Sequence, residues 1–232
     1  MQLSAPLYIL KRNAHRLARE QALPLHQALD QIARGEGYGS WSLLVSQAQF
    51  HQPAHTALAQ FADGDLVLVG ARPQQGKTLF CVQLCLAAMQ DRRHCYFFSL
   101  DYLYADMQAR FTALGQSLAD HQQLFHFDDS DEICADYIIA QLPDAPAGSL
   151  VVVDYLQALE LDRRQPPLSQ QLPRLQQFVQ QRGLQMVFIS QIDRHCVERL
   201  PTTADIKQSN PLDMALFDRT CFLHGGQLRL SA

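Results

Sequence analysis

The sequence has few charged residues and no strong excess of either sign. Charged residues make up 18% of the 232 positions, and the formal net charge is -4. This balance excludes a chain-wide basic coat of the kind that gives strong non-specific nucleic-acid binding, although it permits a local basic lining. Hydrophobic residues reach 47%. The composition therefore argues against disorder, and a chain of this length can bury its own core.

Long apolar runs, a secretory leader and paired cysteines are also missing. No stretch approaches the roughly 20 uninterrupted apolar residues of a membrane-spanning helix, and the N-terminus has no basic segment followed by an apolar run and a cleavage site. We therefore expect a cytoplasmic protein. The six cysteines form no CxxC pair, which argues against a zinc site or a disulfide framework. His94, His195 and His224 show no convergent ligand spacing, so we interpret them as core or surface histidines.

The first 50 residues have the periodicity of a small helical unit. Apolar positions recur at helical spacing from Leu7 to Ala22, and Pro24 opens a second helical pattern. Ser40 is a candidate N-cap for a third, short helix. The stretch His51–His55 contains a proline and is predicted to be a linker. We therefore divide the chain into a helical unit at 1–50, a linker at 51–62 and a main domain at 63–232.

From residue 64 onward, short β-rich runs alternate with longer helical patterns. The runs are apolar throughout, which is typical of strands covered on both faces in a parallel sheet. The predicted strands are Leu66–Val69, Tyr96–Ser99, Leu150–Val153 and Met186–Ile189, and the predicted helices are Lys77–Gln90, Leu103–Leu114, Glu132–Leu142 and Leu168–Arg182. Two further runs, Thr220–His224 and Gln227–Leu230, flank a Gly-Gly pair and predict a closing β-hairpin. The fold class is therefore α/β, with a mostly parallel twisted sheet flanked by helices.

The segment ARPQQGKT lies directly between a predicted strand and a predicted helix and fits a phosphate-binding loop. Backbone N–H groups and a helix N-terminus face the phosphates in such a loop. Gly76 lets the backbone approach the phosphates, Lys77 reaches the β- and γ-phosphates, and Thr78 places its hydroxyl on Mg²⁺. The loop residues are Ala71, Arg72, Pro73, Gln74, Gln75, Gly76, Lys77 and Thr78. ATP with Mg²⁺ is the predicted ligand.

Three other predicted strands deliver polar side chains at their ends. LVVVD ends in Asp154, which predicts a Walker-B carboxylate that holds Mg²⁺ through its water. CYFFSLD ends in Asp101, which either orients or deprotonates the attacking water or caps the following helix. FISQ ends in Gln191, whose amide either senses the γ-phosphate or makes a loop hydrogen bond. Together with the phosphate loop, these residues predict an ATPase site.

Taken in order, GDLVLVGARPQQGKT, YFFSLD, VVVDYLQ, FISQIDR and TADIKQSN resemble the ATPase domain of the DnaB-type replicative helicases, within the RecA-like P-loop group. The resemblance covers about Asp63–Leu223. It implies a RecA-like fold and an ATP-driven motor that moves along single-stranded DNA. It also implies an oligomeric ring, usually a hexamer, with nucleotide sites between neighbouring subunits. Five basic residues match regions that face the ring channel in this family: Arg163, Arg164, Arg194, Arg199 and Lys207.

The sequence departs from the family pattern in three places. Asp101 stands where the family has its catalytic glutamate, and a displacement of the carboxylate by about 1 Å costs as much as ~10²-fold in rate. The family's basic segment with an arginine finger is not matched between the last hairpin and the final residue. Arg219 and Arg229 are therefore the candidates for that role, beside ordinary surface or hairpin roles. The family's Asp-Leu-Arg-Glu-Ser-Gly is replaced by DIKQSN at 205–210.

Two functional hypotheses follow from this pattern. The first is an enzyme that couples ATP hydrolysis to movement on, or remodelling of, single-stranded DNA as an oligomer. The second is a nucleotide-gated adaptor with weak or no hydrolysis, which binds a protein partner through its N-terminal helices. The N-terminal unit itself either docks on such a partner or is a structural cap on the main domain.

Overall fold

Seven strands form one sheet in the order β3-β2-β4-β5-β1-β6-β7. The structure, a computed structural model, describes residues 4–5, 7–73, 75–161, 164–192, 199–206, 212–225 and 227–231. Within the sheet, β7 pairs antiparallel with β6 and the other neighbours pair in parallel. The strands are β1 Leu66–Ala71, β2 Cys95–Ser99, β3 Phe125–Asp128, β4 Leu150–Asp154, β5 Gln185–Gln191, β6 Arg219–His224 and β7 Gln227–Ser231. The predicted α/β fold with a closing hairpin is confirmed.

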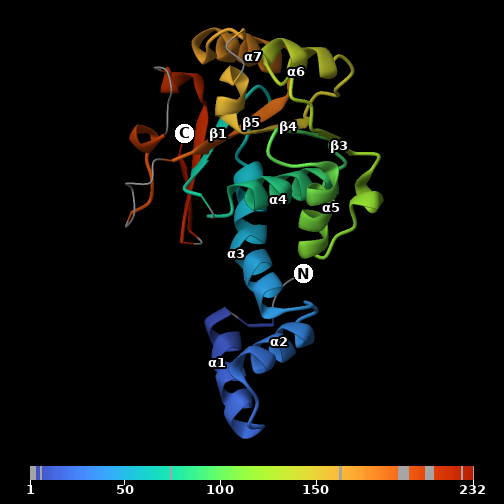
Figure 1. The fold of residues 1–232 in the computed structure, drawn as a ribbon, viewed down its shortest axis with the longest axis vertical. Helices are drawn as coiled ribbons and strands as arrows, with labels where there is room; N and C mark the ends of the chain where they lie inside the picture. The colour runs from blue at the N-terminus through green and yellow to red at the C-terminus, as the bar shows by residue number, and fades with distance from the viewer. Residues whose placement is uncertain are drawn as a thin grey trace.

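Helices cover both faces of the sheet (Figure 1). On one face lie α4 (Lys77–Gln90), α5 (Tyr104–Ala113) and the C-terminal end of α3 (Trp41–Leu58). On the other face lie α6 (Ala135–Gln141) and α7 (Leu168–Arg182). Every residue of β1 and β4 is buried, which explains why these strands show no polar alternation. Among the described residues, no helix combines the length and apolar character of a membrane span.

Sequence reasoning missed strand β3 and placed the start of α6 too early. Strand β3 has four residues, lies at the sheet edge beside β2 and contains no β-branched residue, so its strand signal is weak. Helix α6 begins three residues after the predicted start at Glu132. Short 3₁₀ helices also occur at η1 Leu118–His121, η2 Leu156–Glu160, η3 Thr203–Asp205 and η4 Met214–Leu216. These elements depend on packing at the sheet edges more than on local periodicity.

The predicted linker is helical in the structure. Helix α3 runs through residues 51–58 with Pro53 inside it, and connects the N-terminal helices to the sheet-covering layer (Figure 1). Ala54, Ala57 and Leu58 are buried in the main core together with Phe61. This burial outweighs the cost of a proline in a helix, about 3 kcal/mol. The prediction of a linker is therefore wrong for residues 51–58, and the division of the chain at 50, 62 and 63 stays a prediction.

The N-terminal helices have a small core of their own. Helices α1 (Leu7–Glu20) and α2 (Leu25–Gly35) and the start of α3 enclose Leu10, Ala33, Tyr38 and Leu44. Ser40 caps α3, because its Oγ accepts a hydrogen bond from the N–H of Leu43 at 3.2 Å, as predicted. The predicted third helix is thus correct at its start but longer than expected.

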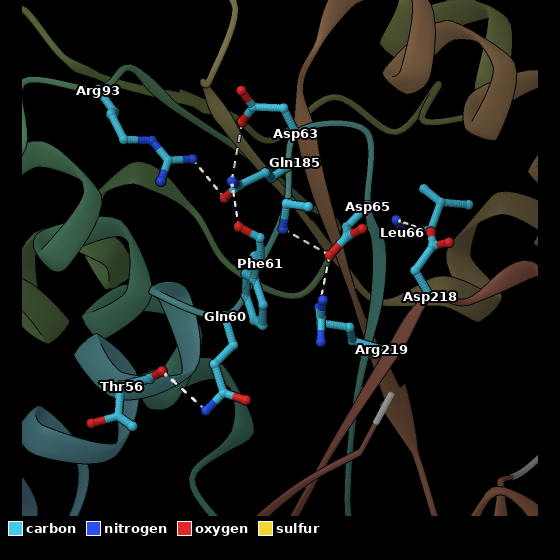
Figure 2. A network of polar contacts seen from close by, with 11 residues as sticks. Thr56, Gln60, Phe61, Asp63, Asp65, Leu66, Arg93, Gln185, Asp218 and Arg219 are labelled. Atoms are coloured by element: carbon cyan, nitrogen blue, oxygen red, sulfur yellow. Dashed lines mark hydrogen bonds and ion pairs between the residues drawn. The ribbon is translucent and has the colours of Figure 1, made fainter.

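A polar network joins the segment after α3 to the N-terminal ends of the strands (Figure 2). Gln185, which is buried at the start of β5, donates from Nε2 to the carbonyl oxygen of Phe61 at 3.2 Å and to Asp63 Oδ1 at 3.3 Å. Its Oε1 accepts from Arg93 Nη2 at 2.6 Å. Both ends of this buried amide are used, so the network fixes the end of α3 against the sheet.

Candidate functional site

The predicted site residues meet at one edge of the sheet, where the parallel strands end. In the register of the sheet, Ala71 at the end of β1 lies between Gln191 of β5 and Leu223 of β6. Asp154 at the end of β4 lies beside Ser99 of β2. Ligands of open α/β sheets bind outside these carboxyl ends. The sheet therefore brings the phosphate loop, Asp154 and Gln191 to one edge.

The phosphate loop connects β1 to the first turn of α4. Gly76 adopts φ +80°, a left-handed conformation that favours glycine, and α4 begins at Lys77 directly after it. The N-terminus of α4 therefore carries unpaired N–H donors and the positive end of the helix dipole. This geometry fits an anion in front of Gly76 and Lys77. Gln74 lies outside the described residues, whereas the other seven loop residues are described.

Asp154 and Thr78 are in direct contact. The Thr78 hydroxyl donates to Asp154 Oδ2 at 2.9 Å, and both side chains are buried. Burial raises the pKa of Asp154 from its ordinary value of 3.8 to about 6, while the Thr78 hydrogen bond and the Lys77 ammonium oppose this rise. The negative charge of Asp101 also raises this pKa. A buried carboxylate in this state is stabilised by any cation that binds beside it.

These residues fit Mg²⁺ bound together with a nucleotide. Mg²⁺ is commonly held by one or two carboxylates plus substrate phosphates and waters. Asp154 and the Thr78 hydroxyl are oxygen donors of this kind, at the foot of the phosphate loop. Among the described residues, no group of three or more His, Cys, Asp or Glu side chains is placed to hold a metal by itself. The donor set therefore matches a shared protein–phosphate site rather than an all-protein cage.

Asp101 is exposed and follows β2, close enough for its charge to act on Asp154 and Tyr155. Its N–H donates to Ser99 Oγ at 3.2 Å. The N-terminus of α5 is instead bonded by Asp106, whose Oδ2 accepts from the N–H of Leu103 at 2.9 Å. Asp106 thus takes the capping contact that sequence reasoning offered as an alternative role for Asp101.

Gln191 is the last residue of β5 and is partly exposed at the edge beside Ala71. The neighbouring Ser190 is buried, and its Oγ accepts from Gln157 Nε2 at 3.1 Å. The sheet thus places the Gln191 backbone next to the phosphate loop. Its two predicted roles, γ-phosphate sensing and a loop hydrogen bond, stay predictions.

The turn of the β6–β7 hairpin contacts the phosphate loop, which sequence reasoning did not foresee. Arg72 Nη2 lies 3.0 Å from His224 Nδ1, and the N–H of Gly225 donates to Gln75 Oε1 at 2.9 Å. Because a guanidinium group has only donors, His224 Nδ1 is the acceptor in the first contact. His224 is therefore a site-edge residue and not merely a core or surface histidine. A sequence signal for this contact is absent, since 152 positions separate the two residues.

Two more residues near the site were missed. Arg110 of α5 lies over the Tyr102 ring, 3.9 Å from its centroid, and its positive charge lowers the pKa of Asp154 against the larger effect of burial. Its Nε is buried without a hydrogen-bond partner. Gly70 precedes the loop, and a Cβ atom there would lie 2.6 Å from Phe222 Cε1. A side chain at Gly70 would therefore clash with β6.

Both arginine-finger candidates have partners within the chain. Arg219 Nε donates to Asp65 Oδ2 at 2.8 Å at the start of β6, the sheet edge opposite the phosphate loop (Figure 2). Arg229 Nη2 donates to the carbonyl oxygen of Pro201, and its guanidinium lies 5.7 Å from the Phe222 ring centroid. Both arginines thus make the ordinary structural contacts that sequence reasoning gave as their alternative roles.

The basic residues predicted to contact DNA are only partly described. Arg163, Arg194 and Lys207 lie outside the described residues, as does most of the altered loop at 205–210. Arg199 is held by Asp205 through two contacts of 2.8 and 2.7 Å, and this pairing holds the pKa of Asp205 well below its usual range. Arg164 lines a cavity that Asp131 and Glu132 also line. The structure therefore gives these two arginines acidic neighbours.

Similarity to solved structures supports the fold at the level of architecture. The chain matches the solved ATPase domain of a DnaB-like helicase with a TM-score of 0.61 and 17% identity, over 76% of this chain and 75% of that chain. It matches a DnaB-like replicative helicase, solved in a study of its interactions with primase, with a TM-score of 0.57 and 17% identity. That match covers 92% of this chain and 66% of the other. No family model and no curated protein matches the sequence.

At this level of identity the matches establish the fold alone. The chain has the RecA-like fold of the DnaB-like helicase ATPase domain, as the sequence motifs predicted. The second match extends over more of this chain than the first. Activity, ligands and partners are matters for the proposal below.

Proposed function

We propose that this chain is an ATPase that binds ATP with Mg²⁺ at the edge formed by the phosphate loop and Asp154. The observation that carries the proposal is the 2.9 Å contact between Thr78 and Asp154. It joins the residue after Lys77 to the carboxylate at the end of a different strand. A buried carboxylate is costly unless a cation or hydrogen bond compensates it, and Thr78 alone leaves the pKa raised. The pair thus has the chemistry of a metal–phosphate site.

In this proposal, each residue has one role. Lys77 and the N–H groups at the start of α4 bind and orient the β- and γ-phosphates. Thr78 and Asp154 would hold Mg²⁺, which supplies neutralisation of charge on the phosphates. Asp101 accepts a proton from the attacking water or orients it, and Gln191 hydrogen-bonds the γ-phosphate.

The proposal extends to assembly and nucleic acid. DnaB-like folds support a ring in which the chain acts as a homo-oligomer, possible as a hexamer, and couples hydrolysis to translocation on or remodelling of single-stranded DNA. The candidate DNA contacts are Arg163, Arg164, Arg194, Arg199 and Lys207. The N-terminal helices, which are held to the main core through α3, are the candidate surface for a protein partner.

The second candidate function is a nucleotide-gated adaptor with weak or no hydrolysis. The contacts of Arg219 and Arg229 within the chain favour it, because an arginine finger must reach the nucleotide of a neighbouring subunit. The exposed Asp101 favours it as well, since a shorter carboxylate stands further from the phosphate than a glutamate does.

Steady-state ATP turnover and ATP affinity of the purified chain test the proposal. Wild type and Lys77→Ala are compared with and without single-stranded DNA, and the particle mass is recorded with the same nucleotide. Lys11→Ala is the matched control, because it is the same substitution on exposed helix α1. We expect Lys77→Ala to lower turnover by at least 10²-fold and Lys11→Ala to leave it unchanged.

The outcomes separate the two candidates. Turnover that needs Lys77 and rises with DNA in a ring-sized particle supports the motor. Tight Lys77-dependent ATP binding with negligible turnover supports the adaptor. Equal ATP binding by wild type and Lys77→Ala contradicts both.

A further inference from the structure

A second cavity lies beside α4, further along this helix than Lys77 and Thr78. Its volume is about 380 Å³, within the range of about 300–1,000 Å³ for small-molecule sites. The segment before α3 forms one wall, and α4 with the end of α5 forms the other; Figure 1 shows these helices next to one another. Tyr38 and Leu43 line the first wall, and Gln83, Leu86 and Leu114 line the second. The cavity therefore lies where the N-terminal unit meets the main domain.

Gln83 is the most unusual residue in this wall. It is 1% exposed, and neither its amide nitrogen nor its amide oxygen has a hydrogen-bond partner. Two other glutamines are equally buried, and both are fully used. Gln171 donates to the carbonyl oxygens of Leu159 and Pro166 and accepts from the N–H of Ala135, and Gln185 makes three contacts described above.

This contrast points to a partner for Gln83 that the chain itself does not supply. A buried amide without a partner costs about 1–3 kcal/mol, so an apolar residue at this position would be more stable. The fold satisfies its other buried glutamines with carbonyl oxygens and N–H groups from neighbouring loops. At Gln83 the neighbour is a cavity. A ligand in that cavity could complete the two hydrogen bonds.

The chemistry of the wall restricts the ligand. The residues that line the cavity include no Asp, Glu, Lys or Arg. An ion would lose hydration there without gaining a counter-charge, so the ligand is neutral and the nucleotide triphosphate group is excluded. Leu43, Leu86 and Leu114 offer apolar surface, and the ring of Tyr38 can pack against a flat molecule. The ligand is therefore neutral, flat and partly apolar.

We infer that this cavity binds a nucleobase through Gln83. A carboxamide presents one donor and one acceptor side by side, and the edge of a nucleobase presents the complementary pair. Glutamine pairs in this way with N6 and N7 of adenine. The base comes either from a free nucleoside or from an unpaired position of a nucleic-acid strand. This site is separate from the phosphate loop and does not depend on ATP hydrolysis.

Titration of the full chain with adenosine tests the inference. The titration is done with and without saturating ATP and Mg²⁺, so that binding in the cavity is separated from binding of a base at the phosphate loop. Gln83→Leu removes the amide and keeps a similar volume. We expect saturable adenosine binding that persists with ATP present and weakens at least tenfold in Gln83→Leu.

Two further variants control the experiment. Gln122→Leu makes the same change at an exposed position outside the cavity lining and should bind like wild type. Leu43→Trp fills the cavity from the opposite wall and should also weaken binding at least tenfold. It keeps the test decisive if Gln83→Leu fails to fold. We expect Gln83→Leu to melt no lower than wild type, because an unpaired buried amide is removed.

The remaining outcomes either identify the source of the base or overturn the inference. Competition by a short oligodeoxyadenylate assigns the base to a nucleic-acid strand, and its absence assigns it to a free nucleoside. Failure to bind adenosine, guanosine, cytidine or uridine overturns the inference and leaves a water-filled cavity. Equal binding by wild type and Gln83→Leu overturns it as well. A chain that fails to bind ATP but binds adenosine through Gln83 contradicts the proposed function alone.

Discussion

The two edges of the sheet use buried and half-buried polar groups in opposite ways. At the edge where the parallel strands begin, Asp65, Gln185 and Arg219 find partners within the chain (Figure 2). At the edge where they end, burial raises the pKa of Asp154, and Arg110 keeps a buried nitrogen without a partner. The first edge is organised for stability. The second holds polar groups whose electrostatic balance a bound ligand can complete.

Asp154→Asn should give the largest change in stability and sharpen the comparison. Burial raises the pKa of Asp154 to about 6, so as pH rises the unfolded chain loses this proton before the folded chain does. The contribution to stability is complete below about pH 3.8 and is lost as pH rises through about 6. At pH 7.5 the nucleotide-free variant should therefore be more stable than wild type by about 3 kcal/mol.

Denaturant unfolding of both proteins between pH 4 and pH 8, without Mg²⁺ or nucleotide, checks this prediction. The difference in unfolding free energy should shrink toward pH 4, where the carboxyl of wild type is protonated in both states. The same variant should lose Mg²⁺-dependent ATP binding. A variant less stable than wild type at pH 7.5 would show that ionised Asp154 is already compensated.

Asp65→Asn should change stability in the opposite direction at the other edge. Asp65 Oδ2 accepts from Arg219 Nε and from the N–H of Ala62, each at 2.8 Å, and the side chain is mostly buried. Loss of its charge weakens both contacts, so the unfolding free energy should fall by about 1.5 kcal/mol. ATP affinity should be unchanged. A stability equal to wild type would mean that this edge is no better compensated than the other.

Substitution of His224 should have the smallest effect and should act on binding rather than on stability. His224→Phe removes the acceptor for Arg72, which leaves one end of the phosphate loop unsupported. We expect ATP affinity about tenfold weaker, equivalent to about 1.4 kcal/mol. His224→Asn keeps a short side-chain acceptor and should bind ATP nearly as tightly as wild type. Both affinities are measured by titration with ATP and Mg²⁺.

Amide hydrogen exchange in the nucleotide-free protein gives a second reading of the same contact. Exchange in the segment 71–78 should be faster in His224→Phe than in His224→Asn or wild type. Equal affinities and exchange rates for the two variants would show that the β6–β7 turn does not position the loop.

Much of the candidate site could be predicted because each part is local in sequence. The phosphate loop carries its own signature between a strand and a helix, and Asp154 follows four apolar residues. The strands of the parallel sheet were visible because burial on both faces requires continuous apolar runs. Strand β3 was missed because it is short and its His126 is exposed. Helix α3 was cut short because Pro53 is a local signal against helix.

The sequence by itself determined the order of strands and helices and the chemistry of the phosphate loop, because hydrophobic period and glycine placement act over a few residues. Only the tertiary structure decided that α3 continues through Pro53, since its Ala54 and Leu58 are buried against the main core. The tertiary structure also decided that His224 meets Arg72 and that Gln83 faces no partner. Such contacts join positions far apart in the chain, and no local pattern of residues encodes which of them will meet.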